Sequence, residues 1–211
     1  MHFPPTQRPH PQRLTPPIWL PQDAVPVHQQ RLAAWPNLPW APLATKGALP
    51  ALWRPWLSER GSLTLALSRY QGTQVQVQVL QEAYTRASAH EAHVLRIRQE
   101  TPVWARHVLL RLQGHAWVFA RTLVPKHAQN LIQRLQPLGN QALGSWLFQQ
   151  KHIRRQALWV TQAPHLRQQL GIHWGRGSCF LWQQQGIWVS EFFLAPMYQA
   201  LIQQAALRNQ I

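Results

Sequence analysis

The stretch that most constrains the fold is residues 103–124, because its pattern is typical of a long β-hairpin. Two apolar runs are separated by Gln113 and Gly114, and glycine readily adopts the positive φ that a two-residue hairpin turn requires. If the strands pair directly from this turn, Arg106 stands opposite Arg121. Because side chains alternate along a strand, the sequence predicts both arginines on one apolar, aromatic face.

Two arginines facing each other on an apolar surface require an anionic partner. Like charges directly opposite destabilise a sheet, and an unpaired guanidinium in apolar surroundings costs more still. One candidate is Glu191, which shares its parity with Ile187, Val189 and Phe193 in the segment IWVSEFFL. Glu191 could simply pair with one of the arginines in the core. Alternatively, the two arginines hold a dianionic ligand, and Glu191 acts on a hydroxyl or a proton within the same pocket.

Periodic patterns along the rest of the chain predict an α+β domain, in which a single antiparallel sheet carries helices on one side. Valine alternates with glutamine in the first predicted strand, which indicates a half-buried strand, and Ser62 can cap the helix that precedes this strand. The predicted strands are 73–85, 92–99, the two arms of 103–124, 152–161, 178–182 and 187–194, and the predicted helices are 49–59, 63–70, 126–135, 142–149 and 197–211.

Proline distribution divides the chain into three segments. Residues 1–44 contain eleven of the eighteen prolines and are expected to form an extended or disordered tail. Residues 45–196 are expected to form the folded domain, and residues 197–211 a C-terminal helical extension.

The single cysteine excludes a disulfide within the chain, and no apolar run approaches the ~18 residues of a membrane span. We therefore expect a cytoplasmic, monomeric protein without membrane contact.

Five short segments together resemble the chorismate–pyruvate lyase family: WARHVLLRLQG, WVFARTLVP, ALGSWLF, HWGRGSCF and WVSEFFLAP. They occur in the order and spacing of that family, over about residues 50–196, with one departure at Gly177, where a second arginine is more familiar. The resemblance implies a single antiparallel sheet with an internal ligand beneath two helix–turn–helix flaps, here near residues 50–70 and 126–149. It also implies conversion of chorismate to 4-hydroxybenzoate and pyruvate, the first committed step of ubiquinone biosynthesis, without a metal or organic cofactor.

The same resemblance assigns a role to each matching residue. Arg106 is implied to bind the ring carboxylate, and Glu191 to contact the ring hydroxyl. Backbone amides of Leu63, where methionine is more familiar, and of Leu143 are implied to contact the ligand. Arg121 matches the arginine of the ART-VP motif, and we hypothesise that it binds the second carboxylate of chorismate, because paired guanidinium groups suit a dianion.

Two other classes of protein are compatible with parts of the sequence. Effector domains of some bacterial transcription regulators resemble the lyase fold, but they follow a winged helix–turn–helix module that the proline-rich tail cannot form. A nucleic-acid-binding protein is suggested by the net charge of +15 and the twelve tryptophans. That function predicts basic and aromatic side chains together on an exposed face, whereas Arg106 and Arg121 lie in apolar runs.

His90 and His93 lack a third metal ligand, so no metal site is predicted.

Overall fold

The computed structural model describes residues 37–162, 167 and 171–208. A seven-stranded sheet forms its centre, with strand order β1-β5-β6-β7-β4-β3-β2 and antiparallel pairing at every step. The predicted α+β class with a single antiparallel sheet is therefore confirmed. The strands are β1 (Ala41–Pro42), β2 (Gln76–Arg86), β3 (Pro102–Leu112), β4 (His115–Pro125), β5 (Arg154–Thr161), β6 (Trp174–Trp182) and β7 (Gln185–Phe193).

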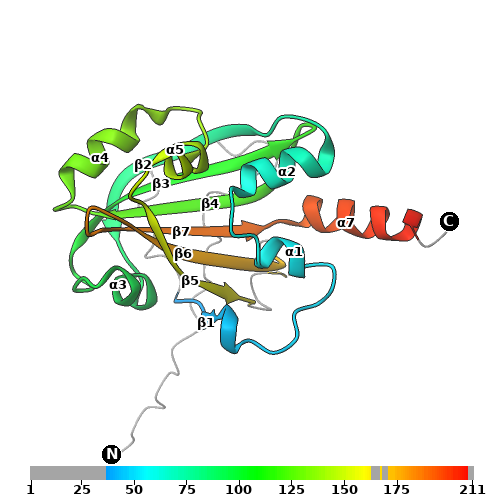
Figure 1. The fold of residues 1–211 in the computed structure, drawn as a ribbon, viewed down its shortest axis with the longest axis horizontal. Coiled ribbons are helices and arrows are strands. Elements are labelled where there is room, and N and C mark those ends of the chain that lie inside the picture. Colours follow the sequence, from blue (N-terminus) through cyan, green and yellow to red (C-terminus); the bar gives the residue numbers. More distant parts are fainter. Residues whose placement is uncertain (1–36, 163–166, 168–170, 209–211) are drawn as a thin grey trace, which may run out of the picture.

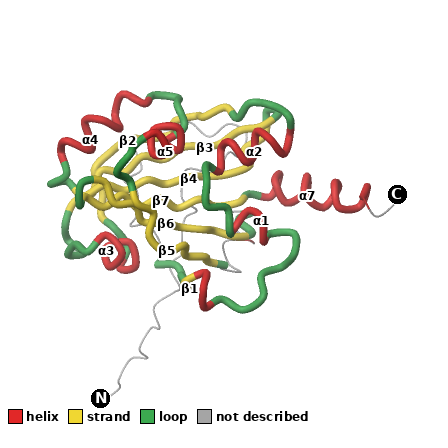
Figure 2. Tube along the Cα trace, viewed as in Figure 1, coloured by secondary structure: helices red, strands yellow, loops and turns green. Residues whose placement is uncertain are grey.

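Most helices cover one face of this sheet, which we call the inner face (Figure 1). The helices are α1 (Arg54–Leu57), α2 (Leu63–Gln71), α3 (Ala89–Leu95), α4 (Gln129–Leu135), α5 (Leu143–Gln149) and α7 (Ala195–Arg208), with short 3-10 helices at η1 (Leu43–Thr45) and η2 (Gln136–Leu138). The tube view separates the red helices from the yellow sheet beneath them (Figure 2). Helix α3 is the exception, because its Ala92 and Leu95 pack with Ala105, Leu123 and Trp188 on the opposite, outer face.

Two helical excursions lie over the inner face and correspond to the expected flaps. Flap 1 comprises α1, the loop after it and α2, whose first turn is capped as predicted, since the Ser62 hydroxyl accepts from the backbone N–H of Leu65. Gly72, with φ of 64°, ends this helix. Flap 2 comprises α4, η2 and α5. Apolar side chains of both flaps pack on the inner face, among them Leu67 of flap 1 and Leu131 of flap 2.

The central hairpin has a different register from the one expected. Pairing close to the turn is as predicted, with Leu112 opposite His115. A β-bulge then inserts Trp117 as an extra residue in β4, so that Arg106 faces Thr122 and Arg121 faces His107. One inserted residue reverses the facing of every later side chain on that strand. The prediction that Arg106 and Arg121 share a face is therefore wrong.

The segment 92–99, predicted as a strand, instead belongs to helix α3 and the turn that follows it. Ser88 and Glu91 form a reciprocal capping box, in which each side chain bonds to the backbone N–H of the other residue. This Ser-x-x-Glu pattern is a helix-start signal that was present in the sequence. The local alternation of apolar residues after Ala92 imitated a strand, because a one-turn helical stripe and a short strand are hard to distinguish.

The folded body extends beyond the range 45–196 at both ends. Leu38 is buried, Trp40 packs against the indole of Trp188, and β1 pairs with β5, although all three lie in the segment expected to be a tail. At the other end, Met197 and Leu201 of α7 are buried in the core beneath flap 1. The expected tail before residue 37 lies outside the described residues. Within the described residues, no helix has the length and apolar character needed to cross a membrane.

Candidate active site

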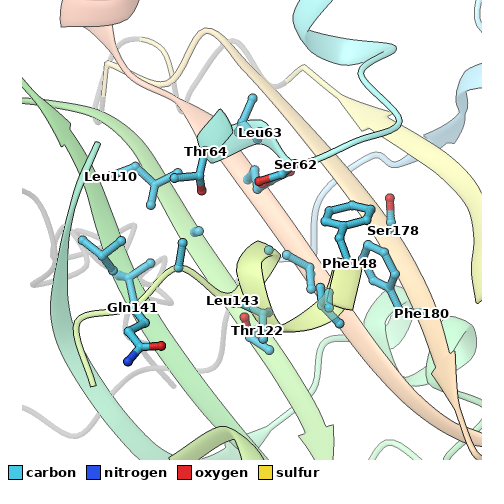
Figure 3. A pocket seen from close by; sticks show the side chains of 18 of the residues that line it. Ser62, Leu63, Thr64, Leu110, Thr122, Gln141, Leu143, Phe148, Ser178 and Phe180 are labelled. Carbon is cyan, nitrogen blue, oxygen red and sulfur yellow. The ribbon is translucent and has the colours of Figure 1, made fainter. Parts of the chain in front are cut away.

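A small cavity lies between the two flaps and the inner face of the sheet. Figure 3 shows Ser62, Leu63 and Thr64 of flap 1 on one side of it, Leu143 of flap 2 on another, and Thr122 of β4 below. The enclosed space is about 50 Å³. Most of the lining is apolar, and the charged side chains among the lining residues are Arg106, Arg155 and Glu191.

Arg106 lies on the inner face of β3 and is only 2% exposed. Its Nη1 donates to the carboxylate of Glu82 on β2, and its Nη2 donates to the backbone carbonyls of Gly139 and Gln141 at 2.5 and 3.2 Å. A bulge in β2 between Val79 and Gln81 creates this ion pair, because it shifts the pairing so that Glu82 faces Arg106. Arg106 therefore connects the sheet to flap 2.

Glu191 points from the last part of β7 toward the cavity, as its parity predicted. Its ionic partner is Arg176 of β6, whose Nε lies 2.6 Å from Oε2 of Glu191. Arg176 is 1% exposed, and its Nη1 also donates to the carbonyls of Trp56 and Glu59 at 2.8 and 2.9 Å. The alternative expectation, that Glu191 pairs with Arg106 or Arg121, is wrong. Arg176 was missed because the predicted strand began at residue 178, whereas β6 begins at Trp174.

Arg155 of β5 also lines the cavity, although sequence analysis did not identify it. Its Nη1 donates to the carbonyls of Glu59 and Arg60 at 3.2 and 2.6 Å, both in flap 1. The guanidinium carbon lies 4.6 Å from the ring centre of Phe180 and 5.5 Å from that of Phe148. Burial lowers the pKa of Arg155 to about 10, an effect that Glu191 partly opposes, so the side chain remains a cation at neutral pH.

The position of Arg155 follows from a third bulge. Pairing between β5 and β6 shifts between Arg155 and Leu158, which places Arg155 opposite Phe180 and on the inner face. Uninterrupted alternation from Leu158 would instead have turned Arg154 inward and Arg155 outward. Sequence reasoning could not have located this inserted residue, because the predicted strand 152–161 alternates only loosely.

Leu63 and Leu143 occupy equivalent positions at the two flaps. Each is the first residue of its helix, α2 or α5, and each lines the cavity. Backbone N–H groups in the first turn of a helix have no acceptor within that helix. The structure therefore brings both predicted residues to the cavity at positions where a backbone amide is available to a ligand.

Arg121 does not lie in the cavity, because the Trp117 bulge turns it to the outer face. Its Nε and Nη2 donate to the two carboxylate oxygens of Glu91 at 3.0 and 3.4 Å, and its Nη1 lies 2.6 Å from Nε2 of His107. Burial, and secondarily the charge of Arg121, lower the pKa of His107 to about 3. This cluster connects α3 to the sheet and is separated from the cavity by the sheet itself.

The charges around the cavity leave an excess of positive charge. Two buried arginines, Arg106 and Arg176, and the half-buried Arg155 are accompanied by two carboxylates, Glu82 and Glu191. An apolar enclosure strengthens each interaction between these groups and a bound anion. Among the described residues, no three side chains of His, Cys, Asp or Glu are grouped to hold a metal ion.

An antiparallel sheet closed by two helical flaps over an arginine-lined internal cavity is a site built for a small organic anion. The family model for chorismate lyase matches residues 36–203 of the chain. A probable chorismate pyruvate-lyase of Chromohalobacter salexigens is 36% identical over 174 residues, covering 79% of this chain and 93% of the relative. A second, from Pseudomonas putida, is 34% identical over 185 residues, covering 82% and 94%. The chain belongs to the chorismate lyase family.

Solved structures with a similar arrangement are more distant. They include PhnF from Mycobacterium smegmatis, with a TM-score of 0.46 and 15% identity over 66% of each chain. The effector domain of the same protein has a TM-score of 0.44 and 15% identity, covering 64% of this chain and 90% of that one.

Proposed function

We propose that the protein is a lyase that converts chorismate to 4-hydroxybenzoate and pyruvate, as the first committed step of ubiquinone biosynthesis, in the cytoplasm and as a monomer. The observation that carries this proposal is the placement of Arg106 and Glu191 in one apolar cavity beneath two flaps, in a chain of the chorismate lyase family. The product carries a carboxylate at one end of its ring and a hydroxyl at the other. These two groups match the guanidinium of Arg106 and the carboxylate of Glu191 on the cavity wall.

Arg106 binds the ring carboxylate in this proposal. In the structure its Nη2 donates to the carbonyls of Gly139 and Gln141 in flap 2. A ligand carboxylate is a stronger acceptor for a guanidinium than a neutral carbonyl, so it can replace them. The backbone amides of Leu63 and Leu143 then donate to the ligand from the two flaps.

Glu191 accepts a hydrogen bond from the ring hydroxyl. One of its oxygens is held by Arg176 at 2.6 Å, which fixes the orientation of the carboxylate on β7. A positioned acceptor at the hydroxyl holds the ring in a single orientation over the sheet. Arg121 has no part in this arrangement, because it lies on the outer face.

The reaction balances without an added redox partner. The bond between the ring carbon and the enolpyruvyl oxygen breaks, and a hydrogen leaves the ring carbon that bears the hydroxyl. The released enolpyruvate takes up a proton on its methylene carbon and becomes pyruvate. Formation of the aromatic ring drives these steps, so positioning and electrostatic stabilisation are the main contributions required of the protein.

Access to the cavity requires movement of the flaps. The enclosed space of about 50 Å³ is smaller than the roughly 300 Å³ at the lower end of small-molecule sites. Substrate therefore enters when the hydrogen bonds between the flaps and the inner face open, and product leaves by the same movement. Lids of this kind often limit turnover.

The proposal is tested by incubating the purified protein with chorismate and measuring 4-hydroxybenzoate and pyruvate, against Glu191→Gln and a blank without enzyme. We expect equimolar products from the wild type and a strong reduction in the variant. Equal rates from both proteins would remove Glu191 from the mechanism. Absence of product, with 4-hydroxybenzoate still bound tightly, would contradict the lyase and favour a ligand-binding domain.

A further inference from the structure

Arg155 keeps one edge of its guanidinium available inside the cavity. Its Nη1 is occupied by two carbonyls of flap 1, but its Nε is buried without a hydrogen-bond partner in the described part of the chain. Its Nη2 has only a long contact of 3.5 Å to the carbonyl of Gly61. The Nε–H and an Nη2–H lie parallel on one edge of the planar group, and two parallel donors are the geometry that a carboxylate accepts in bidentate fashion.

The surroundings of this edge favour an anion. Phe148 of flap 2 and Phe180 of β6 both pack against the guanidinium, with their rings 6.4 Å apart, and Figure 3 shows the two rings together at one end of the cavity. A buried donor without an acceptor is costly, and the neighbouring apolar rings strengthen any ionic bond formed there. The site is therefore incomplete until an acceptor reaches it.

Arg106 and Arg155 approach the cavity from opposite sides. Four inter-strand steps separate β3 from β5, with β7 in the middle, which is roughly 19 Å between backbones at ~4.8 Å per step. Both long side chains nevertheless line the same cavity, and so does Glu191 on the middle strand β7. Each arginine also binds carbonyls of a different flap, Arg106 those of flap 2 and Arg155 those of flap 1.

We propose that Arg155 binds the second carboxylate of the substrate, the one on the enolpyruvyl arm, and thereby makes the cavity selective for the dianionic substrate over the monoanionic product. This inference rests on the proposed function. Arg106 holds the ring carboxylate, which substrate and product share. Arg155 holds the carboxylate that only the substrate carries and that leaves with pyruvate.

Arg176 is less suited to this role, although it is the more buried of the two arginines. Its Nε is occupied by Glu191 and its Nη1 by two carbonyls, so only its Nη2 is without a partner and neither edge of the group offers two free donors to a carboxylate. Arg176 is also absent from the residues that line the cavity. It positions Glu191, whereas Arg155 is placed to contact the ligand.

The test compares dianionic and monoanionic ligands in three proteins: wild type, Arg155→Gln and Arg155→Lys. The adjacent Arg154→Gln serves as a matched control, because Arg154 is exposed and lies on the same strand. Loss of a hydrogen-bonded ion pair should raise the KM for chorismate roughly tenfold to a hundredfold in Arg155→Gln. The Kd for 4-hydroxybenzoate, followed by tryptophan fluorescence, should change by less than about threefold. Arg155→Lys keeps the charge without the planar fork and should recover part of the loss.

A second measurement does not depend on turnover. The wild type should bind 3-(carboxymethoxy)benzoate, which has two carboxylates, more tightly than 3-methoxybenzoate, which has one, and Arg155→Gln should abolish this preference. An equal loss for both ligands, or an unchanged KM for chorismate, would overturn the assignment. A wild type that prefers the diacid through Arg155 but makes no 4-hydroxybenzoate would contradict the proposed lyase while retaining the dianion site.

Discussion

Replacing Arg121 by methionine should destabilise the protein strongly and leave substrate binding intact. Arg121 and Glu91 are 2% and 1% exposed, and two hydrogen bonds of 3.0 and 3.4 Å join them. Removing one partner of a buried ion pair leaves the other charge uncompensated and costs about 3–5 kcal/mol. For a chain of this size, each kcal/mol lowers Tm by about 2–4 °C, so the expected loss is about 6–20 °C.

The matched comparison is Arg106→Met, which removes an arginine of equal burial from the other face of the same hairpin. Its partner Glu82 has a side chain that is 27% exposed and can regain water, so the loss of stability should be smaller. The KM for chorismate should rise steeply in this variant, since Arg106 lines the cavity. Thermal unfolding and steady-state kinetics on both variants separate the two roles.

The reasoning would be refuted if Arg121→Met raised the KM as much as Arg106→Met while keeping the Tm of the wild type. A further variant tests the origin of the effect. Replacing both Glu91 and Arg121 by apolar residues removes the uncompensated charge, and it should recover part of the stability lost in the single variant. No recovery would mean that the other contacts of Arg121, such as that with His107, carry most of the energy.

Two further predictions concern the outer face. A Cβ at Gly177 would lie 2.3 Å from the indole of Trp188, so Gly177→Ala should reduce the free energy of unfolding by about 1–3 kcal/mol, measured as a lower Tm. In the control variant Gly47→Ala the new Cβ meets nothing within 4 Å, so the Tm should not fall. Equal Tm values for the two variants would contradict this packing. His107 has its pKa lowered to about 3, so the folded state binds fewer protons than the unfolded state between pH 6.5 and 3 and loses stability as the pH falls through this range. His107→Gln should therefore reduce the slope of unfolding free energy against pH, measured by urea titration, and an unchanged slope would exclude His107 as a source of it.

The contact between Gly177 and Trp188 also accounts for the departure from the family pattern at this position. Gly177 lies on β6 with its Cα against the indole of Trp188 on the neighbouring strand β7. An arginine side chain cannot occupy the same space. The glycine and the tryptophan are therefore best understood as a packed pair.

Features that depend on neighbouring residues could be predicted from the sequence alone. Alternation identified the central hairpin and placed Arg106 and Glu191 on apolar faces, and both line the cavity. Ser62 and the apolar spacing after it identified α2, because a helix cap is a contact between residues three apart. The capping box of α3 belongs to the same class and could have been recognised from Ser88 and Glu91.

Long-range packing sets the facing of Glu82, Arg121 and Arg155, through a bulge in each of their strands. The bulge in β2 turns Glu82 inward, the bulge in β4 turns Arg121 outward, and the bulge in β5 turns Arg155 inward. Side-chain facing has a period of two residues, so a single inserted residue reverses it for the rest of the strand. Where the insertion falls depends on long-range packing, as at Trp117, which is buried with Val118 in the core beneath flap 1. That choice involves residues far apart in the chain, and no local pattern records it.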